Sequence, residues 1–158
     1  MNNKRLFYSL GVITLIVTIW FSYALYDQNK DSQAMKVLNE SGMNFHQGTF
    51  SEALDKAKSS RSVIMINFYS SWCNVCRKMK TEVFRNPRVN NFYNKNFINM
   101  ALNIDKEPGK SLAKKFDVEA YPTILFVDED SKTIRKVVGF RDVDSFLQLG
   151  QNIVDIKK

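Results

Sequence analysis

Both cysteines of the chain lie within one short segment, directly after an apolar run. Residues 63–69 are almost entirely apolar and rich in strand-forming side chains, and the run is too short for a buried helix. After it, apolar side chains recur at spacings of four, three and four residues, at Trp72, Cys76, Met79 and Val83. The pattern predicts a buried central strand that leads into a helix, with Cys73 at the helix start and Cys76 one turn along its buried face.

Helix and strand patterns alternate through the rest of residues 41–158, which are enough to bury one core. Thr49 and Glu52 fit a capping box, which predicts a helix over about 50–59. Pro87 is expected to end or bend the helix that carries the cysteines. Further strands are expected at 97–104, 123–127 and 133–138, the last two antiparallel, with helices from Pro108 and from Val143 to Val154. These elements predict an α/β fold with a mixed central sheet flanked by helices.

The N-terminal part of the chain has the composition of a membrane span. Residues 6–26 contain no charged side chain. At about 1.5 Å rise per residue, this run is long enough to cross the roughly 30 Å apolar core of a bilayer. Lys4 and Arg5 come directly before it, so the positive-inside rule predicts that the rest of the chain lies on the extracytoplasmic (periplasmic) side.

The sequence therefore predicts three parts. They are a single-pass transmembrane anchor at residues 1–26, a polar tether at 27–40 and a folded domain at 41–158. A cleaved signal peptide is the alternative, with Ser22 and Ala24 as a small-residue cleavage site, and it would leave the domain secreted or periplasmic.

The charge of the chain does not point to nucleic acid. The net charge is +7, but lysines and arginines are scattered among acidic residues, without a long basic run or a nucleic-acid-binding motif. We therefore expect a solvated basic surface and no nucleic-acid partner.

Four chemistries use two cysteines at this spacing. A structural zinc site needs four ligands, and beside the pair the chain has one histidine, His46, so zinc would require a dimer. Covalent haem attachment needs a histidine after the second cysteine, where this chain has Arg77. A permanent structural disulfide would close a loop too small to restrict the unfolded chain much. Redox exchange is favoured, and neither a metal nor a cofactor is expected.

The expected helix suits disulfide exchange. Cys73 would sit at the helix N-terminus, where unpaired amides and the helix dipole stabilise the thiolate, which is the nucleophile. Cys76 would attack the resulting mixed disulfide from the buried face. Three basic side chains, Arg77, Lys78 and Lys80, either add to the positive potential or form a solvated helix face.

The order of motifs resembles the thioredoxin superfamily over nearly all of residues 45–155. A strand is followed by Trp72-Cys-x-x-Cys76 at the start of a helix, and Tyr121-Pro122-Thr123 comes before a later strand. The resemblance implies that Pro122 is cis and lies against the cysteine pair. It also implies that Trp72, Tyr121 and Pro122 bind an extended substrate segment. Gly139 matches a glycine that family members keep near the site. Several segments look like exported thioredoxin-like domains of bacteria, with the C-terminal domain of the bacterial transmembrane electron carrier as the nearest well-understood relative.

Two positions depart from that family. A buried aspartate of thioredoxins, which handles the proton of the resolving thiol, matches Asn67, and the lysine that pairs with it matches Ala101. Since an amide does not titrate, Cys76 would lose its proton to water, to a partner or to another carboxylate such as Glu82. The departures put efficient, thioredoxin-like turnover in question and leave the fold unaffected.

The favoured hypothesis is an exported, membrane-tethered thiol–disulfide oxidoreductase. Cys73 and Cys76 would form its redox-active disulfide, and disulfide-bearing or dithiol proteins of the cell envelope would be its partners. It is expected to act as a reductant, although two intervening residues do not determine the direction. The alternative is a polypeptide-binding module of the same fold with a structural or slow disulfide. Peroxide or glutathione chemistry fits the paired cysteines poorly.

Overall fold

The computed structural model describes residues 15–23, 26 and 42–157, and the chain divides into two compact units, 1–37 and 38–158. In the first unit, residues 15–23 are helical, with large exposed apolar side chains such as Ile19 and Trp20. No helix within the described ranges is long and apolar enough to cross a membrane. Most of the predicted anchor and all of the predicted tether, 27–40, lie outside the described residues.

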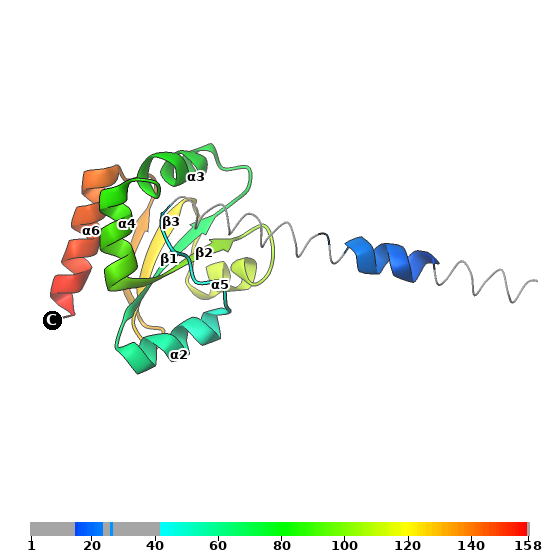
Figure 1. The fold of residues 1–158 in the computed structure, drawn as a ribbon, viewed down its shortest axis with the longest axis horizontal. Coiled ribbons are helices and arrows are strands. Elements are labelled where there is room, and N and C mark those ends of the chain that lie inside the picture. The colour runs from blue at the N-terminus through cyan, green and yellow to red at the C-terminus, as the bar shows by residue number, and fades with distance from the viewer. Residues whose placement is uncertain (1–14, 24–25, 27–41, 158) are drawn as a thin grey trace, which may run out of the picture. The chain divides into compact units, whose positions relative to one another are not determined.

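The second unit is built around a four-stranded sheet (Figure 1). The strands are β1 (Val63–Tyr69), β2 (Phe97–Asn103), β3 (Thr123–Val127) and β4 (Thr133–Val138). The helices are α2 (Phe50–Ser60), α3 (Asn74–Lys78), a π-helical turn η1 (Met79–Val83), α4 (Pro87–Asn96), α5 (Gly109–Lys115) and α6 (Val143–Ile156). The predicted α/β class with a mixed sheet is confirmed.

The strand order is β2-β1-β3-β4, with β1 and β2 parallel and the other two pairs antiparallel. The chain crosses from β1 to its parallel neighbour β2 through α3, η1 and α4. Because β1 lies between β2 and β3, Asn67 in β1 stands opposite Ala101 on one side and Ile124 on the other. The sheet thus brings the carboxyl ends of β1 and β2 to one edge, where the cysteine segment begins.

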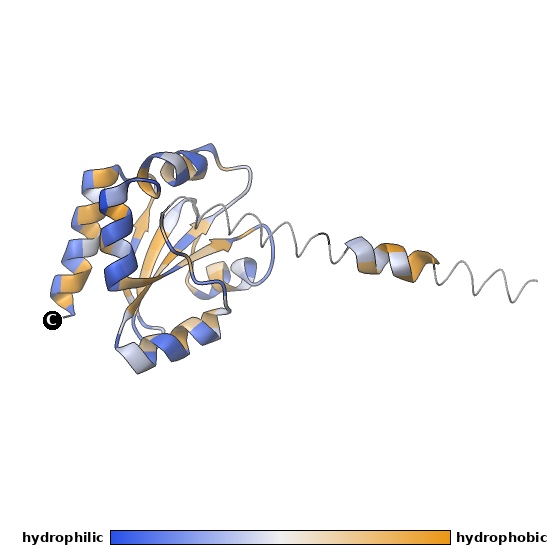
Figure 2. Cartoon of the chain, viewed as in Figure 1, coloured by the Kyte–Doolittle hydropathy of each residue, from blue (hydrophilic) through white to orange (hydrophobic). Residues whose placement is uncertain are grey.

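Helices cover both faces of the sheet, and its strands are mostly apolar (Figure 2). On one face, α2 and α5 pack on alternate strand residues, with Phe50 and Phe116 in edge-to-face contact 5.7 Å apart. On the other face an aromatic cluster joins α4, α6 and the strands. Its members are Phe84, Tyr93, Phe97, Phe126 and Phe146. Tyr93 and Phe146 are fully buried and stack at 4.2 Å.

The capping box at the start of α2 is confirmed. Thr49 Oγ1 accepts from the Glu52 N–H, and Glu52 Oε2 accepts from the Thr49 N–H at 2.6 Å. The Thr49 N–H, and then the Thr49 hydroxyl, donate hydrogen bonds to the Glu52 carboxylate and so lower the pKa of this carboxyl below its usual range.

The helix after the cysteines differs from the prediction in three ways. Trp72 precedes the helix and is 71% exposed, so it does not belong to the buried face of Cys76. The helix ends through η1 at Val83, before Pro87. Pro87 instead begins α4, where Asn86 Oδ1 accepts from the Arg88 N–H and proline takes the first helical position, which needs no N–H. We did not predict α4, because its asparagine-rich sequence has low helix propensity; tertiary packing through Val89 and Tyr93 stabilises it.

Candidate active site

Cys73 is the residue that caps the N-terminus of α3. Its backbone is extended, with φ −79° and ψ 105°, and its Sγ accepts a hydrogen bond from the Cys76 N–H at 3.1 Å. Cys73 and Cys76 form a disulfide with their Cα atoms 5.2 Å apart, and each is 7% exposed. The sulfur of Cys73 therefore already occupies the position where backbone amides favour a negative charge.

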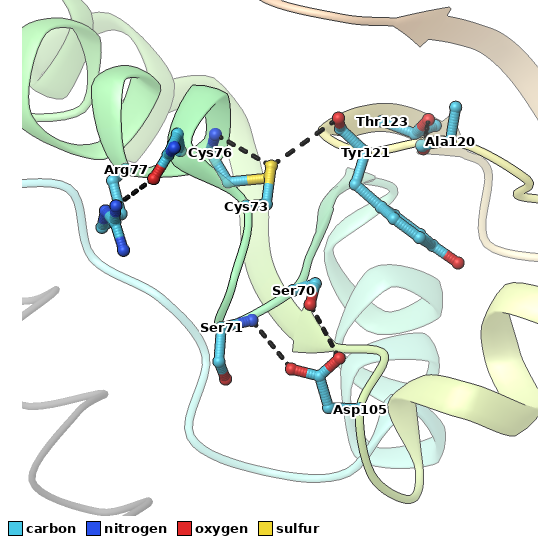
Figure 3. The surroundings of a disulfide bond; sticks show 10 residues. Ser70, Ser71, Cys73, Cys76, Arg77, Asp105, Ala120, Tyr121 and Thr123 are labelled. Carbon is cyan, nitrogen blue, oxygen red and sulfur yellow. Dashed lines mark hydrogen bonds between the residues drawn. A yellow bond between two sulfur atoms is a disulfide. The ribbon is translucent and has the colours of Figure 1, made fainter.

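The loop before β3 lies against this sulfur (Figure 3). The Tyr121–Pro122 peptide is cis, as the resemblance implied, and the Tyr121 carbonyl oxygen is 3.7 Å from Cys73 Sγ. Two hydrogen bonds hold the loop: Thr123 Oγ1 donates to Ala120 O at 2.7 Å, and the Gly139 N–H donates to Pro122 O at 2.8 Å. Gly139 has a φ of +87°, which favours glycine. The structure thus brings Tyr121 and Pro122 to the cysteine pair.

Exposed apolar side chains occur on the elements that carry or adjoin the disulfide. Trp72 is 71% exposed, Val75 between the two cysteines is 46% exposed, and Val138 at the end of β4 is 51% exposed. Val138 pairs with Thr123, the residue after Pro122. These three side chains are therefore accessible to a polypeptide that docks at the disulfide.

The three basic residues after Cys76 are engaged in different contacts. Arg77 donates to Asn74 Oδ1, and Lys78 lies 3.9 Å from the Glu82 carboxylate and 4.7 Å from the centre of the Phe140 ring. Partial burial, and then the charge of Arg85, lower the pKa of Lys80. The Glu82 side chain is 56% exposed and faces Lys78, so the structure does not support Glu82 as the proton acceptor for the buried Cys76.

Asn67 lies in the core of the sheet. It is 6% exposed, and within the described part of the chain its Oδ1 has no hydrogen-bond partner. Ala101 lies directly opposite on β2. The two positions that depart from thioredoxins are therefore neighbours in the structure, and neither carries a titratable group.

Sequence reasoning missed one residue beside the site. Asp105 follows β2 and accepts hydrogen bonds from the Ser70 hydroxyl at 2.7 Å and the Ser71 N–H at 2.8 Å. The Ser71 bond, then the Ser70 bond, lower the pKa of the Asp105 carboxyl. The available signal was an acidic residue directly after the second buried strand, since parallel neighbours end at the same sheet edge.

A metal centre has no structural support in the ranges that are described. No group of three or more histidine, cysteine, aspartate or glutamate side chains there is placed to hold an ion. His46 precedes α2, where its charge would act on Glu52, and it takes no part in the disulfide site.

Comparisons with known proteins agree with this site. A family model described as a thioredoxin-like domain matches residues 50–153. The chain is 27% identical over 157 residues to the thiol:disulfide interchange protein DsbD of Haemophilus influenzae, a match that covers 92% of this chain and 27% of that protein. It is 38% identical over 93 residues to thioredoxin H4 of Arabidopsis thaliana, a match that covers 58% of this chain and 71% of that protein. The solution structure of a thioredoxin from Thermus thermophilus has the same fold, with a TM-score of 0.63 and 24% identity. The superposition covers 72% of this chain and 88% of that thioredoxin.

The lengths of these matches differ. The chain spans only about a quarter of DsbD but most of thioredoxin H4, so a single thioredoxin-like domain is what all of them share with it. The matched residues include the strand, the cysteine pair and the Tyr121–Pro122 loop described above. The chain therefore belongs to the family of thioredoxin-like domains.

Proposed function

We propose that this protein is exported, tethered to the membrane by its N-terminal segment, and reduces disulfides of partner proteins in the cell envelope. The observation that carries the proposal is the position of Cys73 Sγ. It accepts an amide hydrogen bond at the start of α3 and lies next to the Tyr121 carbonyl, and the neighbouring Trp72 and Val75 side chains are exposed. A partner segment bound beside Pro122 would present its disulfide to this sulfur.

The proposed reaction begins with the reduced pair. The Cys73 thiolate attacks one sulfur of the partner disulfide, forming a mixed disulfide and releasing the other partner sulfur as a thiolate, which takes a proton from solvent. Cys76 then loses its proton and attacks Cys73 Sγ, so that the Cys73–Cys76 disulfide forms and the second partner thiolate leaves. Two electrons pass from the cysteine pair to the partner, Cys76 releases its one proton to solvent, and solvent protonates the two partner thiolates.

The membrane tether is supported by the N-terminal sequence. Residues 6–26 carry no charge and follow Lys4 and Arg5, and the described helix at 15–23 has exposed apolar side chains. Fractionation of cells tests this part of the proposal. The full-length chain should stay with membranes after alkaline extraction and be cut by protease added from the extracytoplasmic side. A shortened, extractable product would instead support the cleaved-signal alternative.

Trapping tests the exchange reaction. In a Cys76→Ser variant the second step is blocked, so mixed disulfides with envelope proteins should accumulate through Cys73. The matched control, Cys73→Ser, lacks the nucleophile and should accumulate none. Titration of the pair against glutathione would then give its potential and the direction of exchange. The absence of trapped partners in the Cys76→Ser cells would contradict the proposal.

One observation favours a second candidate, a polypeptide-binding module with a structural disulfide. The buried neighbours Asn67 and Ala101 offer no group to take the Cys76 proton. Such a module predicts a potential below about −300 mV and full function in a double Cys→Ser variant. The oxidoreductase predicts loss of function in that variant.

A further inference from the structure

Asp105 lies beside the loop that connects β1 to α3. Because β1 and β2 are parallel neighbours, they end at the same edge of the sheet. There Asp105 Oδ1 accepts from the Ser70 hydroxyl at 2.7 Å, and Oδ2 accepts from the Ser71 backbone N–H at 2.8 Å (Figure 3). One carboxylate thus binds two consecutive residues of the loop through both of its oxygens.

A second side chain ties the same two segments together. Asn103 Nδ2 donates to Ser71 Oγ at 3.0 Å, and Asn103 Oδ1 accepts from the Asp105 N–H at 2.9 Å. We call the group formed by Ser70, Ser71, Asn103 and Asp105 the Asp105 clamp. Asp105 in this clamp is exposed to solvent, whereas Ser70, to which its carboxylate is bonded, is buried and only 2% accessible.

The clamped loop determines where the nucleophile lies. The Cys73 N–H donates to Ser70 O at 3.2 Å, so the loop closes as a turn immediately before α3. We propose that Asp105 is a positioning residue for disulfide exchange: by holding Ser70 and Ser71 it keeps Cys73 Sγ at the N-terminal amides of α3, where the thiolate is stabilised. This inference rests on the proposed function, because it concerns the state of the attacking sulfur.

Replacing Asp105 has two effects of opposite sign on Cys73. A side-chain amide has one acceptor oxygen, so it can satisfy only one of the two loop donors, and a loosened loop raises the pKa of the Cys73 thiol. Loss of the negative charge alone would lower that pKa. Since the Asp105 side chain is exposed, solvent and salt screen its charge, and we expect the effect of the clamp to dominate.

The test uses the full chain in detergent micelles and a Cys76→Ser background, in which Cys73 is the only cysteine. The rate of Cys73 alkylation by iodoacetamide, measured against pH, gives the thiol pKa. Asp105→Asn and Ser70→Ala should both shift it upward by about half a unit, which is about threefold less thiolate at pH 7. Asp130→Asn removes an exposed charge at the far end of the β3–β4 hairpin and should leave the profile unchanged.

Ser70→Ala separates the clamp from the charge, because it removes one hydrogen bond without changing the number of charges. A downward shift in Asp105→Asn, with Ser70→Ala like the parent, would identify a charge effect and overturn the inference. An unchanged profile in both variants would overturn it as well. The assay needs no partner protein, so a chain that traps no partners but responds as expected would refute the proposed function alone.

Fluorescence provides an independent measurement. The chain has two tryptophans, and Trp20→Phe leaves Trp72, which lies in the clamped loop, as the only one. In that background, Asp105→Asn and Ser70→Ala should change the Trp72 emission maximum and lower its anisotropy, whereas Asp130→Asn should not. Trp72 emission that is the same in all three variants would show that Asp105 does not hold the loop.

Discussion

Asn67→Asp is the substitution whose effect follows most directly from the structure. It places a carboxyl group where the side chain is 6% exposed, between the uncharged Ala101 and Ile124 of the flanking strands. The protonated acid has nearly the shape of the amide, and Asn67 Oδ1 has no hydrogen-bond partner within the described residues, so little is lost at low pH. Ionisation in this environment is costly, and the folded state should raise the pKa of the new carboxyl.

The magnitude follows from linkage. Buried carboxyls have pKa values raised by about 3 units or more, and about 3 units correspond to about 4 kcal/mol. The folded-state pKa is raised, so the unfolded chain releases its proton first, near pH 4. The variant therefore loses stability as the pH rises from about 4 toward the folded-state pKa and then stays at a constant deficit. A domain with about 5–15 kcal/mol of stability would be much weakened at pH 8 yet near normal at pH 4.

Urea unfolding of the oxidised chain at several pH values measures this effect. The difference in unfolding free energy between the parent and Asn67→Asp should be below about 1 kcal/mol at pH 4 and about 4 kcal/mol at pH 8. Asn67→Ala, which introduces no titrating group, should show the same deficit at both pH values. If the Asn67→Asp deficit is also the same at both, the site is not desolvated and the reasoning about its environment is wrong.

Two further predictions concern stability. Tyr93→Phe removes the buried hydrogen bond from the Tyr93 hydroxyl to Phe146 O, which is 2.6 Å long. It should cost about 0.5–1.5 kcal/mol in urea unfolding, the net contribution of one hydrogen bond, and no measurable cost would contradict that contact. Glu52→Gln tests the capping box. Because folding lowers the pKa of Glu52, its carboxylate stabilises the folded state at pH values above its ordinary pKa of 4.5. That stabilisation is lost as the pH falls through the pKa that Glu52 has in the folded state. The parent should therefore be more stable than Glu52→Gln at pH 7, and the difference should shrink by pH 3; a constant difference would show that the carboxylate charge is not what matters.

Features that depend on neighbouring residues could be predicted well. The capping box at Thr49 and Glu52, the buried strand at 63–69 and the start of a helix at Cys73 all match the structure. Each follows from side-chain spacing and from hydrogen bonds within one turn, which a single stretch of sequence contains. The cis peptide at Pro122 also matches, but its prediction came from the family resemblance, since cis bonds are a minority before proline.

Features that depend on packing were predicted poorly. Helix α4 has few strong helix formers and is stabilised by the burial of Val89 and Tyr93, so its sequence alone did not indicate it. Trp72 fits the helical spacing of the buried face, yet the turn at Ser70–Cys73 comes first and leaves the indole exposed. Helical spacing in the sequence predicts which side chains share a face only for residues inside the helix, and Trp72 comes before the helix starts.

A short stretch of sequence specifies the chemistry of this protein: two thiols at helical spacing, with the first at a helix start, after a buried strand. Their surroundings depend on how distant segments pack together. Tyr121 O reaches Cys73 Sγ across 48 residues of sequence, and Asp105 reaches Ser71 across 34. The physical reason is strand pairing, because the antiparallel β3 and the parallel β2 each lie beside β1 and bring their ends to the sheet edge where the cysteine loop begins.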